Sequence, residues 1–126
     1  MKQDRIILGI DPGVATVGFA VLRVGCDELE LRDFGVITTS PDMEFPERLG
    51  LLQSDLRHLI GRHAPTEAYV EELFFGVNSK TALSVAHARG VILAELFSSG
   101  IQARSVTPNQ VKLGVTGDGS ADKRQL

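Results

Sequence analysis

Residues 5–13 read RIILGIDPG, and this stretch decides how the rest of the sequence is interpreted. The run from Arg5 to Ile10 is short and apolar, as in a strand buried on both faces. Asp11 follows it directly, and Pro12-Gly13 is a turn signal that ends the strand. In open α/β sheets functional side chains gather at strand ends. Asp11 is therefore a candidate functional carboxylate, although an aspartate before Pro-Gly is also a common turn residue.

The residues after this turn predict two further strands and then a helix. Residues 17–24 are mostly apolar, and residues 28–38 begin with strict alternation, which is typical of a half-exposed strand. Short connections between the first three strands favour an antiparallel meander. Apolar residues then recur at steps of three and four, which predicts a helix over residues 44–63 that Pro65 closes. That apolar stripe consists of Phe45, Leu49, Leu52, Leu56, Leu59 and Ile60.

Beyond this helix, the sequence alternates strands and helices. Residues 68–71 predict a compact strand, and residues 101–106 a fifth strand. Between them we expect a helix that is capped by Asn78 or Ser79 and runs to about Phe97.

The last twenty residues predict a short helix and the start of another. Thr107-Pro108 is a helix-start signal, residues 114–119 form a glycine-rich loop, and Ser120 can cap a last helix. The order β-β-β-α-β-α-β-α predicts one α/β domain over residues 1–126. Its five-stranded mixed sheet should have three antiparallel strands, then parallel β-α-β units, with helices flanking it.

The composition is close to the globular average, with 43% apolar and 23% charged residues in 126. No apolar run approaches the length of a membrane span, and the N-terminal apolar run is too short for a secretory signal. The single cysteine, Cys26, excludes an internal disulfide, and no Cys/His cluster has zinc-ligand spacing. We therefore expect a cytoplasmic protein.

The charge is distributed unevenly along the chain. The net charge of −3 argues mildly against a nucleic-acid partner, but residues 1–75 hold 7 Lys/Arg against 13 Asp/Glu. Residues 76–126 hold six Lys/Arg against three Asp/Glu. A basic second half is compatible with phosphate binding, and an ordinary solvated surface is the alternative. Its cations are Lys80, Arg89, Arg104, Lys112, Lys123 and Arg124.

A second candidate site lies at the end of the strand predicted over residues 68–71. Glu71 and Glu72 follow apolar residues, and because side chains alternate along a strand, only one of them can share a face with Asp11. Two carboxylates at the ends of central strands repel each other unless a cation lies between them. Oxygen ligands of this kind select Mg²⁺ or Mn²⁺. A solvated glutamate at a strand end is the alternative reading.

Together, these residues resemble the RuvC family of Holliday junction resolvases, the crossover junction endodeoxyribonucleases. The resemblance extends over nearly the whole chain, in order and in spacing. It rests on residues 7–13, Val70-Glu71 followed by Phe74, residues 88–91, residues 110–112 and residues 119–123. It implies a ribonuclease H-like fold and a structure-selective endonuclease that acts on four-way DNA junctions in recombination and repair. Cleavage would proceed by Mg²⁺-dependent two-metal phosphodiester hydrolysis.

The resemblance also implies roles for individual residues. Asp11 and Glu71 correspond to the first two catalytic, metal-binding carboxylates of a site for two Mg²⁺ ions, for which Mn²⁺ can substitute. Phe74 corresponds to an aromatic residue that stacks on an unpaired base near the junction centre, with a core phenylalanine as the alternative. Further DNA contacts are expected from Lys80, Arg89, Lys112 and Lys123.

The family acts as a homodimer, in which each active site makes one of two symmetric cuts, and the resemblance also implies branch-migration partners of the RuvA and RuvB type. A ridge of small residues on the second predicted helix permits close approach, either by the sheet or by a partner. The ridge consists of Ala82, Ala86, Gly90 and Ala94.

One departure from the family concerns the rest of the metal site. The family adds an acidic pair, or Asp with His, on a later helix that this sequence does not reach, so we expect a truncated chain that is inactive alone or nearly so. Asp118 lies in a glycine-flanked loop, and Asp122 lies at a helix N-terminus, where an acid suits the helix dipole in any case. We do not expect either to substitute.

Three alternative functions remain open at this stage. The chain can be a non-catalytic junction-binding fragment, or another ribonuclease H-like nuclease that acts on RNA. It can also be half of an actin-like ATPase or sugar kinase, in which Asp-Pro-Gly belongs to a phosphate loop. That last class needs an ATP-binding loop, and none is visible.

Overall fold

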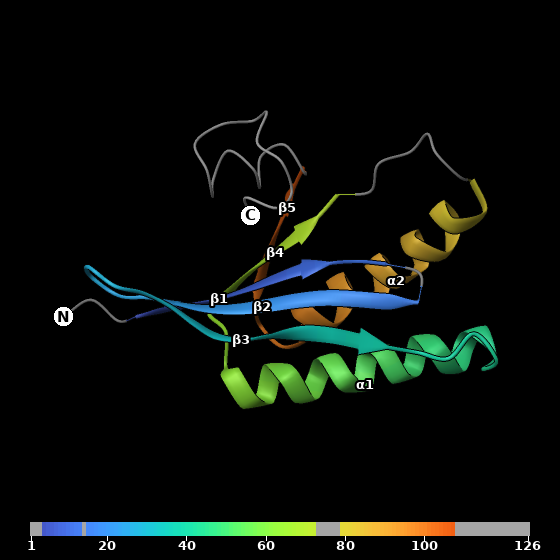
Figure 1. The fold of residues 1–126 in the computed structure, drawn as a ribbon, viewed down its shortest axis with the longest axis horizontal. Helices are drawn as coiled ribbons and strands as arrows, with labels where there is room; N and C mark the ends of the chain where they lie inside the picture. The colour runs from blue at the N-terminus through green and yellow to red at the C-terminus, as the bar shows by residue number, and fades with distance from the viewer. Residues whose placement is uncertain (1–3, 14, 73–78, 108–126) are drawn as a thin grey trace.

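A computed structural model describes residues 4–13, 15–72 and 79–107, apart from the side chains of residues 79 and 80. The predicted strands and the two long helices are present within a few residues of their expected bounds (Figure 1). The helices and segments predicted after Thr107 lie outside the described residues. The elements are β1 (Arg5–Asp11), β2 (Thr16–Val24), β3 (Leu29–Thr38), α1 (Phe45–His63), β4 (Glu67–Glu71), α2 (Ser79–Ser98) and β5 (Gln102–Val106).

The strands form one mixed sheet in the order β3-β2-β1-β4-β5. β1 pairs with β2, and β2 with β3, in antiparallel fashion. β4 then joins the other side of β1 in parallel, and β5 joins β4 in parallel. The predicted meander followed by parallel β-α-β units is therefore confirmed. β1 and β4 are interior strands, and both carry a candidate carboxylate at their last residue.

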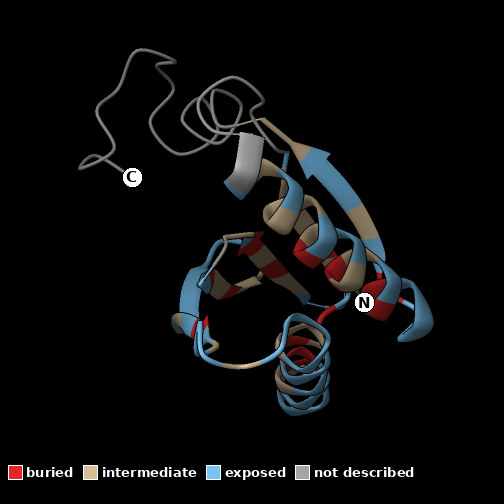
Figure 2. Cartoon of the chain, turned by 90° about the vertical axis from the view of Figure 1, so that its right-hand side faces the viewer, coloured by how far each residue is buried: buried red, intermediate tan, exposed pale blue. Residues whose placement is uncertain are grey.

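Both helices cover the same face of the sheet, and the core lies between them and the strands (Figure 2). The predicted stripe of α1 supplies its buried residues, and α2 buries residues at a spacing of four. The part of the chain that the structure describes has no helix long and apolar enough to span a membrane. The helical core residues are Leu52, Leu56, Leu59 and Ile60 of α1 and Ala88, Ile92 and Leu96 of α2.

β3 is a strand, as the alternation predicted, but its apolar side does not face the core. Leu29 and Leu31 are 70% and 54% exposed. The register of β3 against β2 shifts between Val21 and Leu22, so that Arg32 is an extra residue in β3. Such a bulge reverses the phase of side-chain alternation, and the sequence of β3 alone cannot reveal it.

α1 ends through a left-handed residue rather than through the proline itself. Ala64 has φ 48° and donates its amide to the Ile60 carbonyl at 2.8 Å. Pro65, which the sequence predicted as the end of the helix, follows this turn and is buried. This geometry directs the chain from the end of α1 back into β4.

A buried carboxylate joins the two helices. Glu95 of α2 is buried and accepts hydrogen bonds from Gln53 Nε2 at 3.0 Å and from Arg57 Nη2 at 2.9 Å, both on α1. Ser99 Oγ donates a third bond at 3.1 Å. A buried charge is tolerated when it is paired and hydrogen-bonded in this way, so this network fixes how α1 and α2 pack together.

The Glu95 network makes the fold sensitive to acid. The Arg57 hydrogen bond, aided by Gln53 and Ser99, holds the pKa of Glu95 below its ordinary value of 4.5. A lowered folded pKa adds stability that is present above the unfolded pKa and lost as the pH falls through the folded one. We expect the thermal midpoint to hold at neutral pH and to fall below about pH 4.5, with a shallower fall in Glu95→Gln.

The exposed Asp27 provides a matched control, because it lies in the turn between β2 and β3 and makes none of the Glu95 contacts. Asp27→Asn should leave the acid limb of the midpoint curve unchanged. A parent-like acid limb in Glu95→Gln would show that other carboxylates cause the acid sensitivity.

Candidate metal site

The two candidate carboxylates lie at the same edge of the sheet. The parallel register of β1 with β4 runs from Ile7 beside Glu67 to Ile10 beside Val70. One step further along both strands brings Asp11 next to Glu71, the last residue of each strand. Sixty residues of sequence separate these two side chains, and strand pairing brings them together.

Both carboxylates belong to the sheet face that α1 and α2 leave open. Ile10 and Val70 are buried against the helices, and because alternate residues point to opposite faces, Asp11 and Glu71 are directed the other way. Asp11 is exposed and Glu71 is half-buried. Glu72, the other candidate, is one residue out of phase, and its amide donates to the Val106 carbonyl at 2.7 Å. The register therefore selects Glu71 as the partner of Asp11.

Small residues surround Asp11 on this face. Gly18 pairs with Asp11 across β2, and a methyl group added to Gly18 would lie 3.7 Å from the Asp11 Cβ, an ordinary contact distance. Gly9 precedes Asp11 on the same face of β1. No large side chain from Gly9 or Gly18 therefore covers Asp11, and a cation can approach its carboxylate.

The described donors fit a hard cation but do not complete its coordination. Mg²⁺ takes about six oxygen ligands in near-octahedral geometry, often several of them water, with one or two carboxylates from the protein. Asp11 and Glu71 supply oxygens of that kind. The described residues hold no group of three or more His, Cys, Asp or Glu side chains that could bind a metal. A divalent ion held by Asp11 and Glu71 would take its other ligands from water, DNA or residues outside the described part.

Comparison with known proteins identifies the family. The family model described as crossover junction endodeoxyribonuclease RuvC matches residues 7–126. The chain belongs to the RuvC family. The RuvC protein of Roseiflexus sp. (strain RS-1) is 49% identical over 126 residues, which are all of this chain and 74% of that protein. The RuvC protein of Chloroflexus aurantiacus is 49% identical over 119 residues, covering 94% of this chain and 73% of that protein.

The fold agrees with solved RuvC structures. The structure of Thermus thermophilus RuvC in complex with a Holliday junction substrate superposes with a TM-score of 0.88 at 32% identity. The match covers 96% of this chain and 74% of the Thermus chain. The predicted ribonuclease H-like fold is thus confirmed, and the chain is a member of a family of junction endonucleases.

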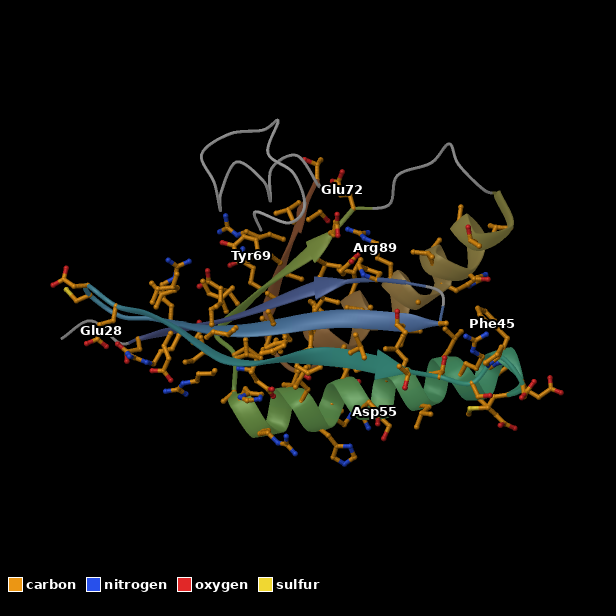
Figure 3. The ribbon with its side chains drawn as sticks, in the orientation of Figure 1. Glu28, Phe45, Asp55, Tyr69, Glu72 and Arg89 are labelled. Carbon is orange, nitrogen blue, oxygen red and sulfur yellow. The ribbon has the colours of Figure 1, made fainter. Side chains whose placement is uncertain are left out.

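The remaining predicted site residues of this RuvC family member divide into two groups. Phe74, Lys112 and Lys123 lie outside the described residues, as does the side chain of Lys80 in α2. Arg89 is described and half-buried. Its Nε donates to the Glu71 carbonyl at 3.3 Å and its Nη2 donates to Ser105 Oγ, so that it lies beside the ends of β4 and β5 (Figure 3).

The sequence did not reveal this contact of Arg89, because an arginine in a basic segment is equally typical of a phosphate contact. The sequence also did not show that position 13 must be glycine for steric reasons, because a Pro-Gly turn signal does not reveal which atoms lie beside the glycine. A Cβ on Gly13 would overlap the Thr16 carbonyl oxygen. The main chain of Thr16 therefore lies so close to Gly13 that it leaves no room for a side chain there.

Gly13→Ala and Gly18→Ala form a matched pair of substitutions beside Asp11. Because the Gly13 methyl would overlap main-chain atoms, Gly13→Ala should force the turn open and cost roughly 1–3 kcal/mol of unfolding free energy. Gly18→Ala should be close to neutral, since its methyl meets Asp11 at an ordinary distance. Urea unfolding curves measure both. Equal losses in the two variants would contradict this steric account of the turn.

Proposed function

We propose that this chain contributes Asp11 and Glu71 to a metal site that hydrolyses phosphodiester bonds at four-way DNA junctions. The observation that supports this most directly is the position of the two carboxylates. They end adjoining parallel strands, in register and on one open face. Membership of the RuvC family supports four-way junction DNA, rather than RNA or ATP, as the substrate.

Each part of the chain contributes differently to this reaction. Divalent ions held by Asp11 and Glu71 would supply polarisation of the scissile phosphate and a lowered pKa for an attacking water. Asp11 and Glu71 provide anionic oxygens on strand ends that the hydrogen-bonded sheet already holds rigid. Little free energy is then needed to arrange the ligands when metal and DNA arrive. We propose two Mg²⁺ ions per site, with Mn²⁺ as a substitute.

Contacts to DNA are proposed for four residues whose side chains lie outside the described part of the structure. Phe74 follows Glu71 by three residues and is suited to stack on an unpaired base, an interaction worth about 1–3 kcal/mol per base. Lys80, Lys112 and Lys123 are proposed to contact phosphates, where each acts as a point charge.

The further metal ligands are proposed to come from outside the described residues. The Roseiflexus and Chloroflexus relatives are longer than this chain, and their additional part is one place where these ligands can lie. We also propose that the protein works in the cytoplasm beside RuvA- and RuvB-type proteins, as the family resemblance implies.

A homodimer through α2 is proposed from the exposed side of that helix. Its buried residues lie on the other side, and the small-residue ridge does not face the sheet, since Gly90 and Ala94 are exposed. On the same side, Leu83 and Phe97 are 68% and 84% exposed. An apolar helix face with a small-residue ridge is suited to close packing against a second copy, and a four-way junction needs two symmetric cuts.

Asp11→Asn tests the metal site. In the full-length protein this variant should keep its affinity for a four-way junction and lose cleavage by orders of magnitude in Mg²⁺, because a neutral amide binds a hard cation poorly. Gel-shift binding without Mg²⁺ and cleavage of a labelled junction measure the two effects. Asp27→Asn, an exposed site in the β2–β3 hairpin, is the control. Parent-like cleavage by Asp11→Asn would exclude it as a ligand.

Leu83→Asp tests the dimer. A buried aspartate at an apolar interface is costly, so the variant should sediment as a monomer at concentrations where the parent is a dimer. Leu29→Asp, equally exposed but on β3, should leave the oligomeric state unchanged. Analytical ultracentrifugation distinguishes the two, and a dimeric Leu83→Asp would place the interface elsewhere.

A further inference from the structure

The relative position of Asp11 and Glu71 is not set by pairing between their own strands alone. The register of β1 with β4 ends at Ile10 beside Val70, one residue before both carboxylates. At this point β4 still pairs with β5, where Glu71 lies beside Val106 and the Glu72 amide bonds the Val106 carbonyl. Whatever holds the ends of β4 and β5 together therefore controls where Glu71 lies.

Arg89 makes such a connection. It projects from α2, which is packed into the core by its neighbour Ala88 and by Ile92. Its guanidinium donates to the Glu71 carbonyl on β4 and to Ser105 Oγ on β5. Figure 3 shows Arg89 between α2 and the end of β4, where Glu72 begins the next segment. One planar side chain thus links a rigid helix to two strand ends.

Arg89 lies on the opposite face of the sheet from the side chains of the proposed metal ligands. α2 lies on the helix-covered face of the sheet, whereas the alternation of β4 directs the Glu71 side chain to the open face. Arg89 contacts the Glu71 main chain, and a guanidinium has no acceptor with which to bind a cation. To reach a phosphate at the carboxylates, it would have to leave both hydrogen bonds. The contact therefore acts on the position of Glu71.

We infer that Arg89 is a positioning residue, which fixes the end of β4 so that the Glu71 carboxylate stands where a divalent cation can be shared with Asp11. This inference rests on the proposed metal site and adds a residue that holds it in shape. Groups that orient metal ligands typically contribute about 10–100-fold to metal affinity. The cost of losing Arg89 should therefore appear in metal binding before any DNA is present.

The test is a Mn²⁺ titration of the 126-residue chain, followed by paramagnetic broadening of the amide signals around Asp11 and Glu71. Arg89→Leu should raise the Mn²⁺ concentration for half-broadening about tenfold. Arg89→Lys should recover part of the loss, since one ammonium can replace one of the two bonds. Ser105→Ala should show a smaller loss in the same direction. Arg62→Leu, in the last turn of α1, should match the parent.

A second measurement is the salt dependence of junction binding without Mg²⁺. A positioning residue leaves the slope of log affinity against log salt unchanged, whereas loss of a phosphate contact lowers it by about one. Unchanged Mn²⁺ binding in Arg89→Leu would overturn the inference. If Arg89→Leu does not fold, unchanged Mn²⁺ binding in both Arg89→Lys and Ser105→Ala would overturn it instead. A Mn²⁺ loss no larger than that of Arg62→Leu would do the same.

The failure of this inference can be told apart from failure of the metal site. Glu71→Gln removes the ligand itself, so it should abolish the broadening around Asp11 at every Mn²⁺ concentration that saturates the parent. If Glu71→Gln binds Mn²⁺ like the parent, the metal site is wrongly placed. If Glu71→Gln loses Mn²⁺ and Arg89→Leu does not, the site stands and the positioning role of Arg89 is wrong.

Discussion

The parallel pairing of β1 with β4 is the constraint on which the rest of the structure depends. Leu8 and Ile10 of β1 and Ala68 and Val70 of β4 are buried together against the helices. A slip of one residue in this pairing would turn the two buried side chains of one strand away from the core and bring polar ones in. Core packing thus sets the register, and the register in turn sets the edge and the face on which both carboxylates lie.

The two faces of the sheet are therefore under different demands. The helix-covered face must exclude water and match the volumes of α1 and α2, whose packing the Glu95 network fixes. The open face carries both carboxylates, and the proposed cation site needs room beside them, which a small residue such as Gly18 leaves next to Asp11. Arg89 links the two, since it leaves a packed helix and ends at the main chain of β4.

Much of the fold and part of the site could be predicted from the sequence. Runs of apolar residues that stop at Asp11 and at Glu71 marked both strand ends. The change in the spacing of apolar residues, to steps of three and four, marked α1. What the sequence concealed depends on tertiary contacts. Glu95 reads as a surface residue until the partners from α1 surround it. Likewise, Arg32 is recognised as an extra residue only when β3 is paired with β2, so the sequence of β3 alone does not show the bulge.

The sixty residues between the paired positions of β1 and β4 also govern the order in which the molecule can form. The β1–β3 meander needs only neighbouring segments and can assemble as soon as they leave the ribosome. The β1–β4 ladder needs α1 to be complete and a long loop to close, which is the slow kind of step in folding. Asp11 and Glu71 meet in that step. A nascent or partly opened chain therefore holds its two carboxylates apart, and the proposed cation site can form only once this ladder is complete.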